Sequence, residues 1–148
     1  MYHLHRELLV PQSIDAVWPY FSDASNLEEL TPASVGFHIL TPQPIVMRQG
    51  TLIDYRIRLH GLPIRWQSEI TVWEPRCRFV DEQRRGPYRR WVHEHRFQAM
   101  GKNTLLVDDV EYALLGGDLV HDLFVRSALG RIFDYRGVVM RERFGAVA

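Results

Sequence analysis

The segment from residue 79 to residue 97, FVDEQRRGPYRRWVHEHRF, constrains the fold of this chain more than any other segment. Gly86-Pro87 separates two runs that are typical of two strands joined by a turn. Side chains of a strand alternate between the two faces of a sheet. One face of the second run therefore carries Trp91, His93, His95 and Phe97. Two aromatic rings and two imidazoles on one face indicate a sheet that lines a cavity with a few polar groups, where small ligands bind.

The rest of the chain predicts an α+β domain. Strands are expected over residues 3–10, 35–40, 51–60, 64–73, 77–83, 89–100 and 104–114. Ser13 is a good N-cap for a short helix that contains Pro19, and a second short helix is expected over residues 25–30. Apolar residues then recur at three- and four-residue steps over residues 118–144, which predicts a long amphipathic helix. This order favours a bent antiparallel sheet of seven strands gripped by the terminal helix.

Alternation along the strands predicts which side chains face the cavity. The inward set is Ile53, Tyr55, Ile57, Leu59, Ile64, Trp66, Ser68, Ile70, Phe79, Asp81, Gln83, Leu106, Asp108, Val110 and Tyr112, with the residues named above. The helix is expected to add Leu123, Phe124, Ser127, Ile132 and Tyr135. A turn centred near Lys102 places His95 near position 109, and a one-residue bulge would bring His95 opposite Asp108.

Composition bounds the function. The 148 residues predict one domain, 1–148, and a net charge of zero does not indicate a nucleic-acid partner. Cys77 is the single cysteine, which excludes an intramolecular disulfide and is typical of a reducing compartment. The first residues do not resemble a signal peptide, and no apolar run is long enough for a membrane-spanning helix. We therefore expect a cytoplasmic protein.

In element order, the whole chain resembles the START-like (SRPBCC) superfamily, which has the helix-grip fold. Val10-Pro11, with Ile14, Val17, Trp18 and Phe21, is similar to the first strand and helix of these proteins. Residues 21–23, 26–28, 30–32 and 79–97 resemble a bacterial group of uncharacterised ligand-binding members. The superfamily includes polyketide cyclase/dehydrase proteins and coenzyme Q-binding relatives. It also includes lipid carriers and hormone receptors, so the resemblance implies a fold more than a function.

Four interpretations of the inward polar groups stay open: an internal hydrogen-bond network, a site that orients the polar end of an apolar ligand, acid–base catalysis and a metal site at His93 and His95. The leading hypothesis is a protein that binds a lipid, quinone or polyketide-like molecule, without a metal or cofactor. The expected ligand-binding residues are Tyr55, Ile57, Trp66, Phe79, Asp81, Trp91, His93, His95, Phe97, Asp108, Tyr112, Phe124 and Ser127.

Two other hypotheses belong to different classes of protein. One is a cyclase or dehydratase in which His93 or His95 acts as general base and Asp108 or Asp81 orients it. The other is a quinone-handling or chaperone-like adaptor, which an exposed apolar patch around the second short helix would favour. A separate expectation is that Leu27 and Leu30 on that helix form a lid over the mouth of the cavity.

Overall fold

The computed structural model describes residues 1–59 and 61–147. His60, at the end of a predicted strand, and Ala148, at the end of the predicted domain, lie outside the described residues. Within this part, seven strands form one antiparallel sheet in the order β1-β7-β6-β5-β4-β3-β2. The strands are β1 (Tyr2–Val10), β2 (His38–Ile39), β3 (Leu52–Leu59), β4 (Leu62–Glu74), β5 (Arg78–Arg85), β6 (Arg90–Met100) and β7 (Asn103–Ala113). The predicted α+β class and the seven strands are confirmed.

Short helical segments follow β1. The helix α1 (Ile14–Phe21) begins after Ser13, whose side chain accepts a hydrogen bond from the Ala16 amide, as an N-cap does. The second predicted helix is a 3₁₀ turn, η1 (Ala24–Leu27), and a further 3₁₀ turn, η2 (Ala33–Val35), follows. Leu30 is buried in the core and Leu27 packs against it. The two leucines therefore anchor this segment to the core, and their role as a lid stays a prediction.

The C-terminal helix is continuous but changes its winding. It consists of α2 (Gly117–Val120), a π-helical segment η3 (His121–Val125) and α3 (Arg126–Phe144). The prediction of a long terminal helix is confirmed. Of its predicted inward residues, Ile132 packs against the interior, whereas the other four do not. Leu123 and Phe124 are 60% and 61% exposed, and Ser127 and Tyr135 are exposed as well. The buried residues of α3 are Leu129, Phe133, Arg136, Val139, Met140 and Phe144.

Two polar anchors explain the true rotation of this helix. His121 is buried at the start of η3, where its Nε2 lies 2.6 Å from the Tyr112 hydroxyl and its ring stacks on Tyr2. Arg136, in the C-terminal half of the helix, is also buried, and its guanidinium donates a hydrogen bond to Asp108 of β7. A pattern of apolar residues alone omits His121 and Arg136. The buried face that such a pattern predicts is therefore shifted by about one residue along the helix from the observed face.

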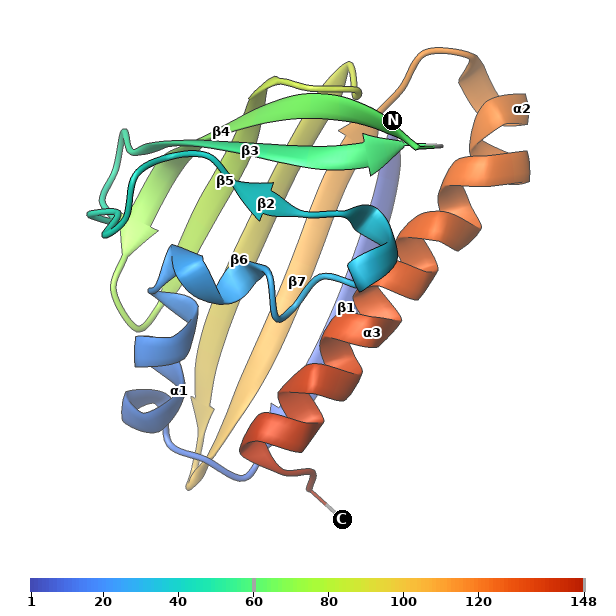
Figure 1. Cartoon of the computed structure of the whole chain (residues 1–148). Helices are drawn as coiled ribbons and strands as arrows, with labels where there is room; N and C mark the ends of the chain where they lie inside the picture. The colour runs from blue at the N-terminus through green and yellow to red at the C-terminus, as the bar shows by residue number, and fades with distance from the viewer. Residues whose placement is uncertain (60, 148) are drawn as a thin grey trace.

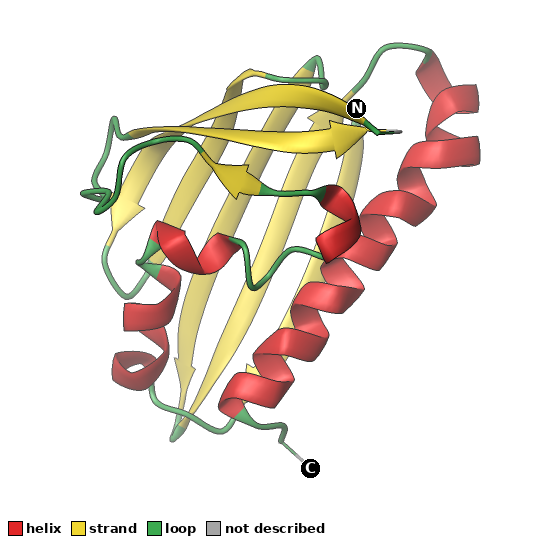
Figure 2. Ribbon diagram, in the orientation of Figure 1, coloured by secondary structure: helices red, strands yellow, loops and turns green. Residues whose placement is uncertain are grey.

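The elements form two layers around one interior. Figures 1 and 2 show the curved sheet behind, with α1 and the 3₁₀ turns lying in front of it and α3 running diagonally along the β1 side. The interior contains two apolar clusters. The first includes Trp18, Phe21, Phe97 and Phe144, and the second includes Trp66, Trp91, Leu129 and Phe133.

The sheet register brings the inward polar residues together. A tight turn pairs Met100 with Asn103, so His95 lies directly opposite Asp108 without the bulge that the sequence required. On the other side of β6, Asp81 of β5 lies opposite His93. Because all these side chains point into the interior, three neighbouring strands place two imidazoles and two carboxylates in contact.

Candidate functional site

A buried polar cluster lies at the boundary between the two apolar clusters. His93 Nε2 lies 2.8 Å from Asp108 Oδ1, and His95 Nε2 lies 2.7 Å from Asp81 Oδ2. The sequence predicted a pairing of His95 with Asp108, and these two residues are indeed opposite each other. The shorter hydrogen bonds, however, are diagonal. In the strand register His95 lies opposite Asp108 and His93 opposite Asp81, but His95 bonds to Asp81 and His93 to Asp108. His95 Nδ1 stays 3.5 Å from Asp108 Oδ1.

Arg136 completes the cluster from the helix. Its Nε donates to Asp108 Oδ2 at 3.1 Å, and its terminal nitrogen lies 3.4 Å from His95 Nδ1. The guanidinium also lies over the Phe21 ring, 5.6 Å from its centroid. Arg136 therefore links α3 to β6, β7 and α1. Apolar periodicity does not reveal this residue, although it falls on the spacing of the buried residues Leu129, Phe133 and Met140.

Burial and pairing set the charges of the cluster. Burial alone raises the pKa of Asp108, but Arg136 and the hydrogen bond from His93 outweigh it and hold the pKa well below its usual value. Burial likewise raises the pKa of Asp81, and its bond to His95 reverses the effect, so that the net shift is downward. Burial and the neighbouring His93 lower the pKa of His95 to about 4, so His95 is neutral at pH 7. Its Nε2 then donates to Asp81, and its Nδ1 accepts from Arg136.

The cluster offers three donor atoms to a metal ion but not a suitable ring geometry. Atoms of Asp81, His93 and His95 lie within 4.8 Å of one another. The two imidazole rings, however, are stacked, with centroids 3.6 Å apart and planes 26° apart. A nitrogen lone pair lies in the plane of its ring, so two nearly parallel rings cannot both direct their lone pairs at one ion. This arrangement suits hydrogen bonding better than metal binding.

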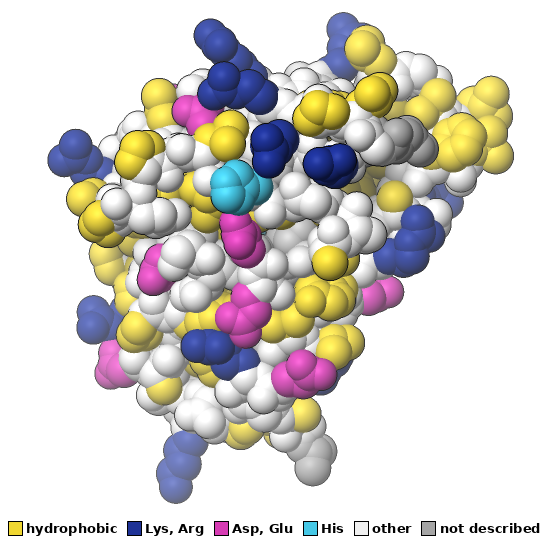
Figure 3. Space-filling model, viewed as in Figure 1, with side chains coloured by type: hydrophobic (Ala, Val, Ile, Leu, Met, Phe, Trp, Pro, Cys, Tyr) yellow, Lys and Arg dark blue, Asp and Glu magenta, His cyan; other side chains and the backbone are white. Residues whose placement is uncertain are grey.

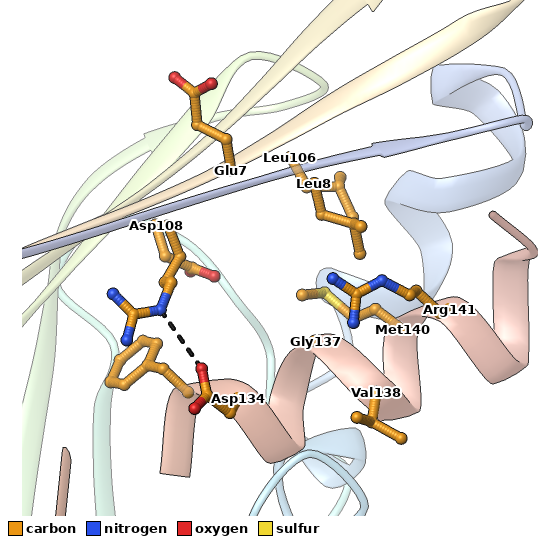
Figure 4. A pocket seen from close by; sticks show the side chains of 11 residues that line it. Glu7, Leu8, Leu106, Asp108, Asp134, Gly137, Val138, Met140 and Arg141 are labelled. Atoms are coloured by element: carbon orange, nitrogen blue, oxygen red, sulfur yellow. Dashed lines mark ion pairs between the residues drawn. The ribbon is translucent and has the colours of Figure 1, made fainter. Parts of the chain in front are cut away.

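A pocket of about 200 Å³ between β1 and α3 reaches the cluster. Figure 4 shows Asp108 at its floor, Leu8 and Met140 on its walls, and Arg141 across one end. Gly137 of α3 lies at the pocket and has no side chain to fill it. At the rim, Arg6 forms an ion pair with Asp134, with 3.6 Å between Nε and Oδ1. Asp108 is the buried charged residue of this pocket, whereas Arg6, Glu7, Asp134 and Arg141, which also line it, are exposed.

Aromatic side chains fill the other half of the interior. Trp66 packs against Trp91 and Tyr88 with ring centroids 5.4 and 5.6 Å apart. The Ser68 hydroxyl lies 3.1 Å from both the Tyr55 hydroxyl and Trp66 Nε1. These predicted wall residues therefore contact one another and satisfy one another's polar atoms.

The remaining predicted site residues fall in different places. Ile57 and Tyr112 lie in the second apolar cluster with Trp66 and Trp91, whereas Phe79 and Phe97 lie in the first. Phe79 stacks on His95, with ring centroids 4.1 Å apart, and so borders the polar cluster. Phe124 and Ser127 point away from the interior, and the expectation that they line it is wrong.

Comparison with solved structures identifies the fold. A START superfamily protein from Mycobacterium smegmatis superposes with a TM-score of 0.70 at 14% identity, and 97% of each chain is covered. The chain has the START-like, helix-grip fold. Major latex-like protein 151 of ginseng, Panax ginseng, has the same fold, with a TM-score of 0.69 at 11% identity and 97% of each chain covered.

The START-like fold also occurs in an enzyme. Norcoclaurine synthase from Thalictrum flavum, solved with dopamine and hydroxybenzaldehyde, superposes with a TM-score of 0.65 at 18% identity, over 95% of this chain and 87% of that one. No family model matches the sequence, and no curated protein matches it. At these identities the likeness establishes the START-like fold, and no ligand or activity carries over from it.

No helix in the described part of the chain combines the length and the apolar character needed to cross a bilayer.

Proposed function

We propose that this protein binds a small, largely apolar molecule that carries one hydroxyl or amine group. The pocket between β1 and α3 receives the ligand, and the carboxylate of Asp108 orients its polar group. Apolar side chains of Leu8, Leu106 and Phe133 line the same pocket and supply contact with the rest of the molecule. The ligand classes that fit are phenols, alcohols and amines, including polyketide-like phenols and lipids with a hydroxyl group.

The observation that carries this proposal is the buried carboxylate of Asp108 in a pocket that is lined both by apolar side chains and by the charged residues Arg6, Glu7, Asp134 and Arg141. Asp108 is 5% exposed and accepts bonds from His93 and Arg136, which leaves lone pairs on a carboxylate that can accept about four hydrogen bonds. Its lowered pKa keeps Asp108 ionised at neutral pH, so this carboxylate favours a ligand group that donates a hydrogen bond or carries a positive charge.

The size of the pocket limits the ligand. About 200 Å³ is below the roughly 300–1,000 Å³ of typical small-molecule sites. A single-ring molecule or the head of a longer one fits this volume. A whole quinone or lipid would require the aromatic side chains around Trp66 and Trp91 to move.

Native mass spectrometry of the freshly purified protein, with organic extraction of any bound compound, tests the proposal. A thermal-shift panel of phenols, alcohols and amines covers ligands that the expression host lacks. Asp108→Asn should abolish the shift caused by the best compound, whereas Asp109→Asn, one residue away on the opposite face, should keep it. Equal binding by both variants, or a clean mass together with no response to the panel, would contradict the proposal. Circular dichroism confirms that each variant is folded.

One observation favours acid–base catalysis as a second candidate function. A general base needs one imidazole nitrogen held and the other available. Both ring nitrogens of His95 form hydrogen bonds. In His93, Asp108 holds Nε2, and the nearest carboxylate oxygen to Nδ1 is Asp81 Oδ2 at 3.8 Å. In this candidate, His93 is the base and Asp108 the positioning residue. A compound that binds and is then converted by the wild type, but only bound by His93→Gln, would establish it.

A further inference from the structure

An exposed apolar end of the molecule suggests a second function, independent of the ligand pocket. Four side chains just before the C-terminal helix and in its first turns are 60–70% exposed: Leu115, Leu119, Leu123 and Phe124. Leu62, at the end of the β3–β4 hairpin, is 68% exposed. Figure 3 shows hydrophobic side chains gathered around α2 on this face. We call these five residues the apolar end.

The hairpin and the helix belong to the same end of the molecule. Ile57 and Ile64, which pair two positions before the Leu62 end of the hairpin, share an apolar cluster with Val125 and Leu129 of the helix. Leu114 also packs against this cluster, next to the exposed Leu115. The apolar end is therefore continuous with the aromatic half of the interior. Single exposed leucines need no explanation, but such a group marks an interaction site.

Unpaired arginines lie beside the apolar end. Arg56, Arg58 and Arg65 are exposed on the outer face of the hairpin, and none has a carboxylate within 4.0 Å among the described residues. Arg56 lies directly opposite Arg65, and like charges in that position are destabilising. The pair is three residues, or about 10 Å, from the end of the hairpin. This distance is close to the Debye length at physiological ionic strength, so charges at a surface in contact with the apolar end still attract the arginines.

We propose that the apolar end docks on the surface of an anionic lipid bilayer. Exposed leucine and phenylalanine side chains insert at the boundary of headgroups and acyl chains, and nearby arginines are attracted to anionic headgroups. A second copy of the chain fits less well, because a two-fold contact through this end would bring one set of unpaired arginines towards the other. The acidic residues of α2 and η3 are already engaged, Asp118 by Tyr2 and Asp122 by Arg126.

Co-sedimentation of the purified protein with vesicles tests this docking. The vesicles contain phosphatidylcholine alone, or phosphatidylcholine and phosphatidylglycerol in equal parts. The protein should pellet with the mixed vesicles, and binding should weaken as salt is raised. The substitutions Arg56→Gln and Arg65→Gln together should lower the affinity roughly twentyfold to thirtyfold, at about fivefold for each arginine. Phe124→Ser should lower it by about tenfold or more.

Matched controls come from the loop before β3. Val46 is 71% exposed, and Arg48 is exposed in the same loop. Val46→Ser and Arg48→Gln should bind vesicles like the wild type. Equal binding to both kinds of vesicle, or binding to neither, overturns the proposal. So does a dimer in analytical ultracentrifugation that Phe124→Ser dissociates while no vesicle binding is seen. The assay needs no ligand, so its failure and the failure of the ligand-binding proposal are distinguishable.

Discussion

Arg136 is the residue on which the buried charges of this protein depend. It neutralises Asp108 and supplies a hydrogen bond to His95, and it is itself 8% exposed. Breaking a buried ion pair by removing one partner typically costs about 3–5 kcal/mol, because the other charge remains buried. The same pairing keeps Asp108 ionised at the floor of the pocket. At the scale of a residue, one guanidinium therefore stabilises the buried charges and sets the ionisation of the carboxylate that we propose binds the ligand.

The neutral state of His95 predicts a loss of stability in acid. Its pKa is about 4 in the folded protein and about 6.5 when unfolded, so between these values the unfolded chain binds a proton that the folded chain does not. The free energy of unfolding should fall as the pH falls from 6.5 to 4, by on the order of 3 kcal/mol for the full shift. Urea unfolding at a series of pH values measures this.

Two variants identify the group responsible for this acid sensitivity. His95→Gln keeps a donor for Asp81 and should flatten the change between pH 6.5 and pH 4. His38→Gln, at an exposed imidazole, should retain it. The same slope in His95→Gln as in the wild type would mean that another group titrates. Below pH 4, the lowered pKa values of Asp81 and Asp108 predict a further loss, because both carboxylates must then take up protons.

At the scale of an element, α3 combines a core face with a gap. Leu129 and Phe133 pack into the aromatic half of the interior, whereas Gly137 leaves room for the pocket against β1. Glycine within a helix costs roughly 0.5–1 kcal/mol relative to alanine. A Cβ at Gly137 would meet only Arg141 Nη1, at 3.7 Å, so the backbone does not require glycine there. The residue is best explained by the space it leaves.

Paired glycine substitutions test that explanation. Gly137→Ala and Gly130→Ala should each raise the free energy of unfolding by roughly 0.5–1 kcal/mol in urea titrations. A Cβ at Gly130 would meet only Arg6 Nη2, at 3.9 Å, and Gly130 does not line the pocket. Only Gly137→Ala should therefore weaken binding of the best compound from the thermal-shift panel. An equal effect of both substitutions on binding would place the ligand elsewhere.

At the scale of the whole molecule, the interior has an open part at the pocket and a packed part around Trp66 and Trp91. The polar cluster lies between the two apolar clusters, with Phe79 stacked on His95 on one side and Phe133 beside His93 on the other. The aromatic cluster around Trp66 and Trp91 is packed, which makes it a core in this state of the protein. The pocket lies on the β1 side of the polar cluster. The apolar end, which we propose contacts the membrane, lies next to the cluster of Trp66 and Trp91.

Trp91→Ala distinguishes a core from a ligand wall. Trp91 is 8% exposed and contacts Trp66, Tyr88 and Tyr112. The substitution should lower the free energy of unfolding by about 3–5 kcal/mol, as in other packed cores. Leu115→Ala, at a side chain that is 69% exposed, should change it by less than about 0.5 kcal/mol. If Trp91→Ala kept its stability but lost ligand binding, the residue would be part of the site wall.

The strands, the inward face of β6 and the fold can be predicted from local patterns in the sequence. Alternation in Trp91, His93, His95 and Phe97 is a local property, and each of these residues is buried as predicted. Strand period and the resemblance in element order therefore sufficed for the seven-stranded sheet and the terminal helix. Even the facing of His95 and Asp108 followed from the turn between β6 and β7, to within one residue.

The arrangement of side chains in the interior depends on contacts between residues far apart in the sequence. Arg136 and His121 are polar, so the periodicity of apolar residues does not place them on the buried face of the helix. The same periodicity predicts Phe124 and Ser127 on that face, where the structure does not place them. The diagonal bonds of the two imidazoles depend on three strands and a helix meeting at one point. The pocket at Gly137 and the apolar end at Phe124 likewise arise from the rotation of one helix, which long-range contacts with Tyr112 and Asp108 set.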